Sequence, residues 1–258
     1  RQPGRTDEAA ETAAASMRLM PPDPRPARLA VGVMVGLEPA TRALGAAREW
    51  QARSQPDTYE ADTTAAALLV RLGRIDEAAA QLERWADRIE RDPTVPPVLF
   101  RIYAASLITS GRADTASELF QRRRDTDARW LSHQIETARD LIAFHDVPDK
   151  ARDWLDDAAP LANGQPERAL RVAQAAVDLA DRTGNTEDID RAVAASDAAR
   201  TVYHSAEDQS QASAAAMLLV QAHRFAGNPA VAAALARSLT APAPSEPTAY
   251  ALLTAAII

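Results

Sequence analysis

The chain has 258 residues, a net charge of −7, 47% hydrophobic residues and 25% charged residues. This balance is typical of a folded globular protein and excludes an intrinsically disordered chain. The acidic net charge gives no global electrostatic reason to bind nucleic acid or an anionic membrane, and the absence of cysteine excludes disulfides and thiolate metal ligands.

The N-terminal segment is predicted to be separate from the rest of the chain. Residues 6–20, TDEAAETAAASMRLM, are typical of a helix with Thr6 as its N-cap residue. The proline-rich PPDPRPA that follows predicts a linker, so residues 1–26 are expected to be an N-terminal helix and linker. The apolar run LAVGVMVGL is too short to span a bilayer. Because the sequence begins with Arg1 and stops within an apolar pattern, we expect it to be a fragment of a longer protein.

A helical hairpin is predicted around Gly73. The segment ADTTAAALLVRL (61–72) predicts one helix, and RIDEAAAQLERWADRI (74–89) predicts a second, whose apolar residues are spaced by three or four. Glycine has no Cβ and readily adopts the left-handed conformation that ends a helix. Gly73 is therefore expected to form the turn between the two helices.

The same arrangement recurs along the chain, which is the strongest pattern in the sequence. Proline-rich breaks near residues 94, 163 and 243 separate the hairpins. In HDVPDK an aspartate takes the place of the turn glycine, because aspartate tolerates turn conformations. The intervals between turn residues are 35 to 43 residues, which predicts a helical repeat array. The turn residues are Gly36 in a weaker copy, Gly73, Gly111, Asp146, Gly184 and Gly227.

The segments LLVRLGRIDEAAAQLERW and ASLITSGRADTASELF resemble the tetratricopeptide repeat (TPR) family, which has glycine at the turn, a small residue five positions later and a bulky residue four positions beyond. The resemblance covers roughly residues 27–258. Two departures are that the spacings exceed the 34 residues of that family and that first-helix positions are often both alanine or valine. The resemblance implies an all-α, right-handed α-solenoid of five to six stacked helical hairpins, a TPR-like superhelix.

Candidate catalytic and metal-binding residues are sparse. The sequence contains no nucleophile motif and no phosphate- or dinucleotide-binding glycine loop. Acidic pairs such as Asp188 and Asp190 could act in acid–base chemistry, but a place in a first helical turn favours stabilisation of the helix. The histidines are not spaced to put two metal ligands on one helical face: His133, His145, His204 and His223. We therefore predict a protein that is not an enzyme, with no metal and no cofactor.

The basic and aromatic residues have structural interpretations. Arginines 122–124 form the one basic cluster, but consecutive helical residues point about 100 degrees apart, so we expect a solvated helix end. Leu82 and Phe120 are expected to be buried between hairpins. The tryptophans fall at equivalent places in separate repeats, which favours packing over a ligand-stacking surface: Trp50, Trp85, Trp130 and Trp154.

The resemblance also implies a concave groove lined by the first helix of each hairpin. Counting back ten, six and three residues from each turn gives one helical face, whose middle would be acidic. The lysine-rich carboxylate clamp of some family members has no counterpart, because the sole lysine, Lys150, lies in a turn. We expect a partner segment with positive charge at its centre. The groove residues predicted are Arg101, Glu136, Asp140, Gln174, Asp178, Asp181, Met217, Gln221 and Arg224, with Ala105, Ile108 and Ala143 on the same faces.

The expected function is a protein–protein interaction scaffold that binds a protein or peptide partner in the groove. The alternative is a regulatory or sensor segment of a larger multidomain protein acting in signalling, transcription or envelope assembly. Neither nucleic-acid binding nor a membrane span within the chain is expected. The sequence does not distinguish a cytoplasmic from a periplasmic location.

Overall fold

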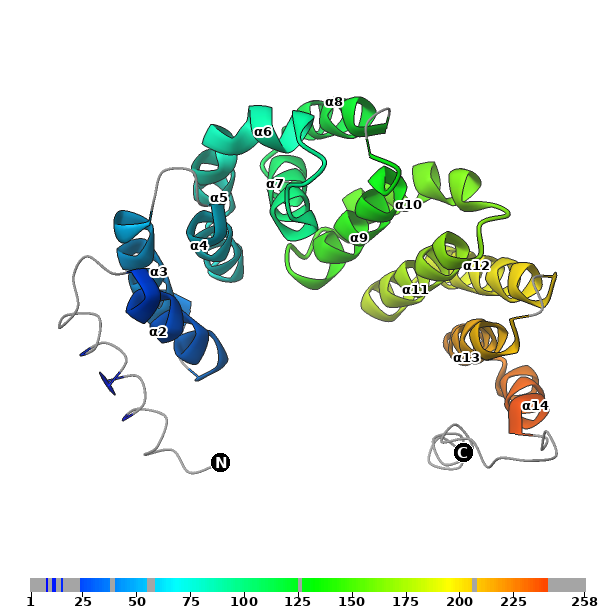
Figure 1. Cartoon of the computed structure of the whole chain (residues 1–258). Helices are drawn as coiled ribbons and strands as arrows, with labels where there is room; N and C mark the ends of the chain where they lie inside the picture. The colour runs from blue at the N-terminus through cyan, green and yellow to red at the C-terminus, as the bar shows by residue number, and fades with distance from the viewer. Residues whose placement is uncertain are drawn as a thin grey trace. The chain divides into compact units, whose positions relative to one another are not determined.

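The fold is helical in every part of the chain that the structure describes. The computed structural model describes four helical residues near the N-terminus (Glu8, Glu11, Thr12 and Ala15) and residues 24–37, 40–54, 59–124, 127–205 and 208–240. These residues form helices and no strand (Figure 1). The chain divides into two units, residues 1–128 and 129–258. The prediction of an all-α protein is confirmed.

Two predicted segments lie partly or wholly outside the described residues. Thr6, most of the helix expected over residues 6–20 and the proline-rich break near residue 243 lie outside them. The linker expected to end at residue 26 is shorter than predicted, because α2 begins at Pro24. Proline suits the first turn of a helix, where its missing N–H leaves no hydrogen bond unmade.

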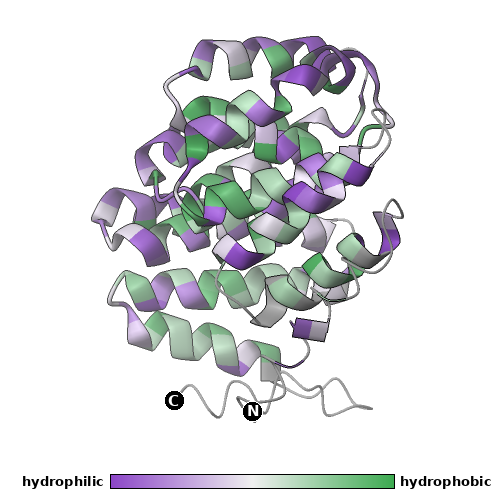
Figure 2. Ribbon diagram, turned by 90° about the vertical axis from the view of Figure 1, so that its left-hand side faces the viewer, coloured by the Kyte–Doolittle hydropathy of each residue, from purple (hydrophilic) through white to green (hydrophobic). Residues whose placement is uncertain are grey.

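In the first unit the helices pack in neighbouring pairs. α2 contacts α3, α4 contacts α5, and α7 contacts α8, while α3 with α4 and α5 with α7 join one pair to the next. The bounds are α2 Pro24–Leu37, α3 Ala40–Arg53, α4 Tyr59–Arg71, α5 Ile75–Leu82, η1 Glu83–Trp85, α6 Ala86–Arg91, α7 Pro97–Thr109 and α8 Ala113–Arg124. Hydrophobic and hydrophilic residues alternate along the helices (Figure 2), as expected where one side of a helix packs and the other is hydrated.

The single helix predicted over residues 74–89 is wrong, because the 3₁₀ turn η1 separates α5 from α6. Two of its residues face different neighbours: Glu83 accepts hydrogen bonds from Tyr103 and Arg112, whereas Trp85 donates to Asp62 of α4. A 3₁₀ helix turns about 120 degrees per residue. Glu83 and Trp85 are two positions apart, so they point about 120 degrees apart around the helix axis.

Buried polar side chains join the helices of the first unit. Asp62 is 1% exposed and accepts hydrogen bonds from Trp85 at 2.6 Å, from Gln51 at 2.5 Å and from Arg84. A buried carboxylate of this kind is stable only because donors surround it.

Arg123 corrects the prediction of a solvated helix end. It is 1% exposed and donates at 2.8 Å to the carbonyl of Ile89, one of the last four of α6. The carbonyls of a final helical turn have no partner within their own helix. Arg123 therefore supplies, from inside the core, a hydrogen-bond donor to a carbonyl at the C-terminal end of α6. Arg122, in contrast, is exposed.

Most of the residues predicted to pack between hairpins are buried. Leu82 and Phe120 are 0% and 3% exposed, and the Phe120 ring meets that of Phe100 edge to face with centroids 4.9 Å apart. Three of the four tryptophans are buried: Trp50, Trp85 and Trp154. The prediction of packing is confirmed for these residues, while Trp130 is only partly buried.

The second unit continues the same pairing. Its helices are α9 Trp130–Ala143, α10 Pro148–Ala162, α11 Pro166–Thr183, α12 Thr186–Ser205, α13 Gln209–Phe225 and α14 Pro229–Thr240. α9 pairs with α10, α11 with α12, and α13 with α14, and α11 also contacts both α9 and α13. The first helices of three successive pairs therefore lie side by side in this unit.

Five of the six predicted turns are confirmed by their backbone angles, whereas the turn expected at Gly36 is wrong, because Gly36 lies within α2. Gly73, Gly111, Gly184 and Gly227 have positive φ values of 71, 82, 63 and 68 degrees. Asp146, predicted to replace glycine, is the single described non-glycine residue with positive φ, at 54 degrees. The repeat register read from the sequence therefore marks the ends of α4, α7, α9, α11 and α13.

Candidate functional site

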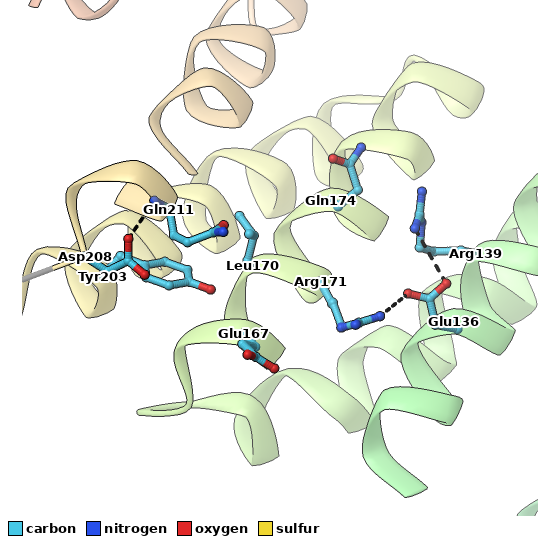
Figure 3. Close-up of a pocket in the computed structure, with 9 residues that line it drawn as sticks. All are labelled: Glu136, Arg139, Glu167, Leu170, Arg171, Gln174, Tyr203, Asp208 and Gln211. Carbon is cyan, nitrogen blue, oxygen red and sulfur yellow. Dashed lines mark hydrogen bonds and ion pairs between the residues drawn. The ribbon is translucent and has the colours of Figure 1, made fainter. Parts of the chain in front are cut away.

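A pocket of about 480 Å³ lies in the second unit where α9, α11, α12 and α13 meet (Figure 3). Most of its lining is polar or charged, and Leu170 gives it an apolar wall. The lining residues are Glu136, Arg139, Glu167, Leu170, Arg171, Gln174, Tyr203, Asp208 and Gln211.

One face of α11 supplies the floor of the pocket. Glu167, Arg171, Gln174 and Asp178 follow one another at spacings of four, three and four residues, which places them in a row along the helix. Glu136 and Arg139 have the same relation on α9, at a spacing of three. Because α9 and α11 pack together, the two rows face each other.

Ion pairs cross from one row to the other. Arg171 of α11 donates to Glu136 of α9 at 2.9 Å, and Arg139 of α9 donates to Asp178 of α11 at 2.9 Å. Gln174 also donates to Asp178 at 2.9 Å. These contacts hold the side chains at the α9 end of the pocket in defined positions, although each pair is too exposed to add much stability.

Tyr203 and Asp208 form the opposite end of the pocket. Tyr203 comes from the last turn of α12 and is 3% exposed. Asp208 is the N-cap residue of α13, and its carboxylate accepts a hydrogen bond from the backbone N–H of Gln211 at 3.1 Å. Burial, followed by the nearby charges of Glu167 and Asp208, raises the pKa of the Tyr203 phenol. The hydroxyl therefore stays protonated at neutral pH.

The structure brings some of the predicted groove residues together and leaves others apart. Glu136 and Gln174 line the pocket, and Asp178 adjoins it through its contacts with Arg139 and Gln174. Six predicted residues do not line it: Asp140 and Asp181 on α9 and α11, Met217, Gln221 and Arg224 on α13, and Arg101 on α7 in the first unit.

The face predicted for α7 is packed instead of open. Ala105 and Ile108, on the same predicted face as Arg101, are 0% and 1% exposed. α7 contacts α4, α5 and α8, so several sides of this helix are used for packing. The prediction of a groove face with Ala105 and Ile108 is therefore wrong.

The expectation of an acidic groove centre overlooked two arginines. Arg139 lies one residue before the predicted Asp140, and Arg171 lies three residues before the predicted Gln174. Extending the α11 row beyond Gln174 with the same three- and four-residue steps would have found both Arg171 and Glu167. Nothing in the local pattern indicated Tyr203, which reaches the pocket from a second helix.

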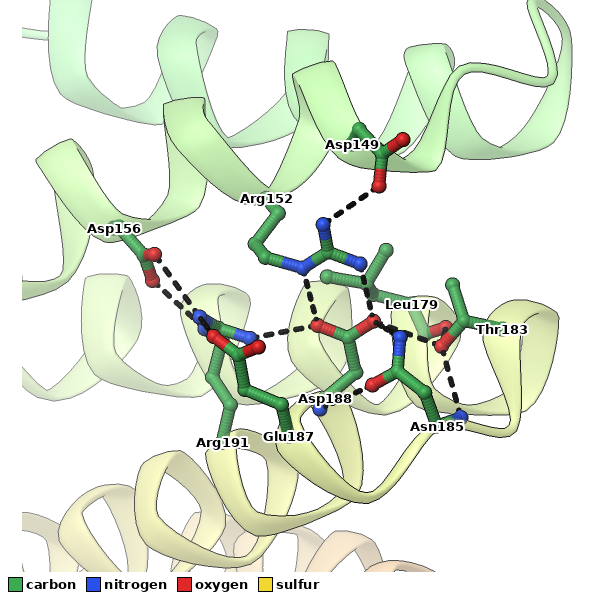
Figure 4. Close-up of polar contacts among 9 residues, drawn as sticks. All are labelled: Asp149, Arg152, Asp156, Leu179, Thr183, Asn185, Glu187, Asp188 and Arg191. Atoms are coloured by element: carbon green, nitrogen blue, oxygen red, sulfur yellow. Dashed lines mark hydrogen bonds and ion pairs between the residues drawn. The ribbon is translucent and has the colours of Figure 1, made fainter.

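Asp188, one of the acidic pair considered for acid–base chemistry, has a structural role. Asp188 is 0% exposed and accepts two hydrogen bonds from Arg152, at 2.7 and 2.8 Å, and one from Arg191 at 2.6 Å (Figure 4). Thr183 and Asn185 donate at 2.8 Å each. The hydrogen bond from Arg152, above all, lowers the Asp188 pKa. A carboxylate occupied by five donors ties α10 to α12 and leaves little capacity to accept a further proton.

Other candidate sites are less developed. In the first unit a pocket of about 340 Å³ contains Trp50 and three arginines, of which Arg28 pairs with Glu60 and Arg53 with Glu49. Among the described residues, no three or more histidine, aspartate or glutamate side chains gather as metal ligands would. Within the same part of the chain, none of the helices combines the length and apolar character needed to cross a membrane.

Comparison with known proteins gives no assignment: no protein-family model and no curated protein sequence matches the chain.

Proposed function

We propose that the chain is a non-catalytic helical-repeat scaffold that binds an extended segment of a partner protein along the face of α9, α11 and α13. The repeats are of the tetratricopeptide type, stacked as a right-handed α-solenoid over residues 27–258. Support comes from the left-handed turn residue that recurs from Gly73 to Gly227 and from helix pairs that pack on their neighbours. Arrays of this kind bind partners over an extended surface.

The pocket at the meeting point of α9, α11, α12 and α13 is the observation that carries the proposal. Its volume of about 480 Å³ falls within the range of about 300–1,000 Å³ that is common for binding pockets. The Arg171–Glu136 and Arg139–Asp178 pairs order several of its polar side chains before a partner arrives. Ordering in advance lowers the entropic cost of binding.

Selection from a phage-displayed library of random nonapeptides tests the proposal. Gln211→Trp places a bulky side chain in the pocket from an exposed position in the first turn of α13. The matched control is Ala194→Trp, at an exposed position of α12 nine residues before Tyr203, about 14 Å along the helix.

We expect selected peptides to bind the native protein and Ala194→Trp, and to lose at least tenfold in affinity for Gln211→Trp. If no peptide is selected, peptide binding by this chain is rejected. Equal binding to all three proteins would place the binding surface elsewhere.

A further inference from the structure

Charge is unevenly distributed along the pocket of the second unit. At the α9 end, Arg139 and Arg171 are matched by Glu136 and Asp178. At the opposite end Glu167 and Asp208 bring two further negative charges. Glu167 lies four residues before Arg171, a spacing that permits an ion pair, but the Arg171 guanidinium reaches Glu136 instead. In the part of the chain that the structure describes, neither Glu167 nor Asp208 has an ion-pair partner.

Tyr203 points to a ligand at this acidic end. Its side chain is almost completely buried, yet its hydroxyl is directed into the pocket toward Glu167 and Leu170 (Figure 3). Among the described residues no hydrogen-bond partner serves this hydroxyl. Because the hydroxyl faces the pocket, it is open to a hydrogen bond from a ligand, and a phenol oxygen accepts hydrogen bonds from cations as well as donating one. The hydroxyl and the two carboxylates together offer acceptors and no positive charge.

We infer that the acidic end formed by Glu167, Tyr203 and Asp208 binds the basic side chain, lysine or arginine, of the partner segment. The inference rests on the proposed function, which supplies the peptide that carries the cation. The alkyl stem of such a side chain packs along Leu170, and its charged head lies among the oxygens. The charges at the α9 end already neutralise one another in ion pairs, so that end does not select for a charged partner. The pocket therefore requires positive charge at only one side chain of the partner segment.

The test uses free butylammonium, which has the charge and most of the stem of a lysine side chain. The full chain is titrated with butylammonium chloride or butylguanidinium chloride and followed by two-dimensional ¹H–¹⁵N NMR. Potassium butyrate and potassium chloride at equal ionic strength serve as reference salts. We expect saturable shifts of the amides of Leu170, Tyr203 and Gln211 with both cations and not with the reference salts.

Variants locate the cation. In Glu167→Gln with Asp208→Asn both charges are removed, while asparagine preserves the N-cap of α13. Partly exposed charge pairs contribute about 1.4- to 5-fold each in affinity, so we expect the double variant to bind about 2- to 25-fold more weakly. Tyr203→Phe also binds more weakly. The control Asp190→Asn, at an exposed position of α12 about 20 Å along the helix from Tyr203, leaves affinity unchanged.

The outcomes separate this inference from the proposed function, because butylammonium is not a peptide. Cation shifts no larger than those with potassium chloride would overturn the inference, and so would equal affinity of the double variant and the native protein. Either result leaves selection from the peptide library free to succeed. Cation binding without any selected peptide would support the acidic end as a cation site while rejecting the scaffold function.

Discussion

Replacing Asp188 by asparagine tests whether one buried carboxylate holds α10 against α12. Asparagine has one acceptor oxygen instead of two, so it can serve about two of the five donors that surround Asp188, and its N–H₂ group would face arginine. Breaking a buried ion pair typically costs about 3–5 kcal/mol. The side chains of Arg152 and Arg191 are 19% and 20% exposed and can regain some hydration. We therefore expect Asp188→Asn to lower the free energy of unfolding of the second unit by about 3 kcal/mol.

Urea denaturation followed by tryptophan fluorescence measures this loss. The two units carry separate reporters, Trp50 and Trp85 in the first and Trp130 and Trp154 in the second, so variants that retain one pair at a time distinguish them. With a urea slope of about 1–3 kcal/mol per molar, the midpoint of the second unit falls by about 1–3 M. Repeat arrays transmit damage mainly to adjacent repeats, so the first unit shifts less.

The control for this prediction is Asp190→Asn on the same helix. Asp190 is exposed, and surface substitutions of this kind change stability by less than about 0.5 kcal/mol. A loss below about 1 kcal/mol in Asp188→Asn, or an equal loss in both variants, would refute the idea that the Arg152–Asp188–Arg191 contacts stabilise the packing.

Three further predictions concern packing, turns and pH. Phe120→Ala removes a ring packed edge to face on a second aromatic ring and is expected to cost about 3–5 kcal/mol; an unchanged urea midpoint of the first unit would contradict this. Gly184→Ala is expected to cost about 1–2 kcal/mol, because an added Cβ meets no atom within 4 Å but φ is +63 degrees. In contrast, Gly45→Ala within α3, which also has open space at Cβ, is expected to stabilise by about 0.5–1 kcal/mol; thermal melts that shift in the same direction for both variants would rule out the backbone explanation. Burial lowers the His145 pKa to about 4, whereas an unfolded histidine has a pKa of about 6.5. The unfolded chain therefore binds this proton first, and the free energy of unfolding should fall as the pH drops from about 6.5 to about 4. In His145→Gln, the free energy of unfolding measured by urea titration should change less over this pH range than in the native protein. The lowered pKa of Asp188 makes stability depend on pH only below the pKa of an unfolded aspartate, about 4. As the pH falls through this range, the difference in free energy of unfolding between the native protein and Asp188→Asn should narrow.

The turns could be predicted from the sequence because their requirement is local. A left-handed residue is needed wherever a helix stops and the chain reverses, and glycine meets this need at the lowest cost. Asp146 was recognised by its place in the register, although aspartate adopts positive φ far less readily than glycine. The amphipathic spacing within each helix was likewise enough to predict the burial of Leu82 and Phe120.

The polar contacts between hairpins could not be predicted in the same way. Arg139 and Asp178 are 39 residues apart, and Arg152 and Asp188 are 36 residues apart, so neither pair leaves a local pattern. Arg123 was expected at a solvated helix end because three consecutive arginines cannot share one helical face, but in its buried place it donates to a carbonyl of another helix and pairs with the buried Asp127. The pocket residue Tyr203 escaped notice for the same reason, since only the packing of α12 against α11 carries it there.

The core of the second unit has a practical consequence for anyone who studies it by mutagenesis. Nine of the thirteen buried residues in its main cluster are alanine. Alanine scanning, the usual way to find the positions on which a fold depends, has nothing to remove at these sites. The informative experiment runs in the opposite direction, because overpacking a close-packed interior by even a few methylene groups costs about 1–3 kcal/mol. A scan that enlarges Ala173, Ala192 and Ala215, each 0% exposed, to leucine would map contacts between helices that truncation leaves invisible.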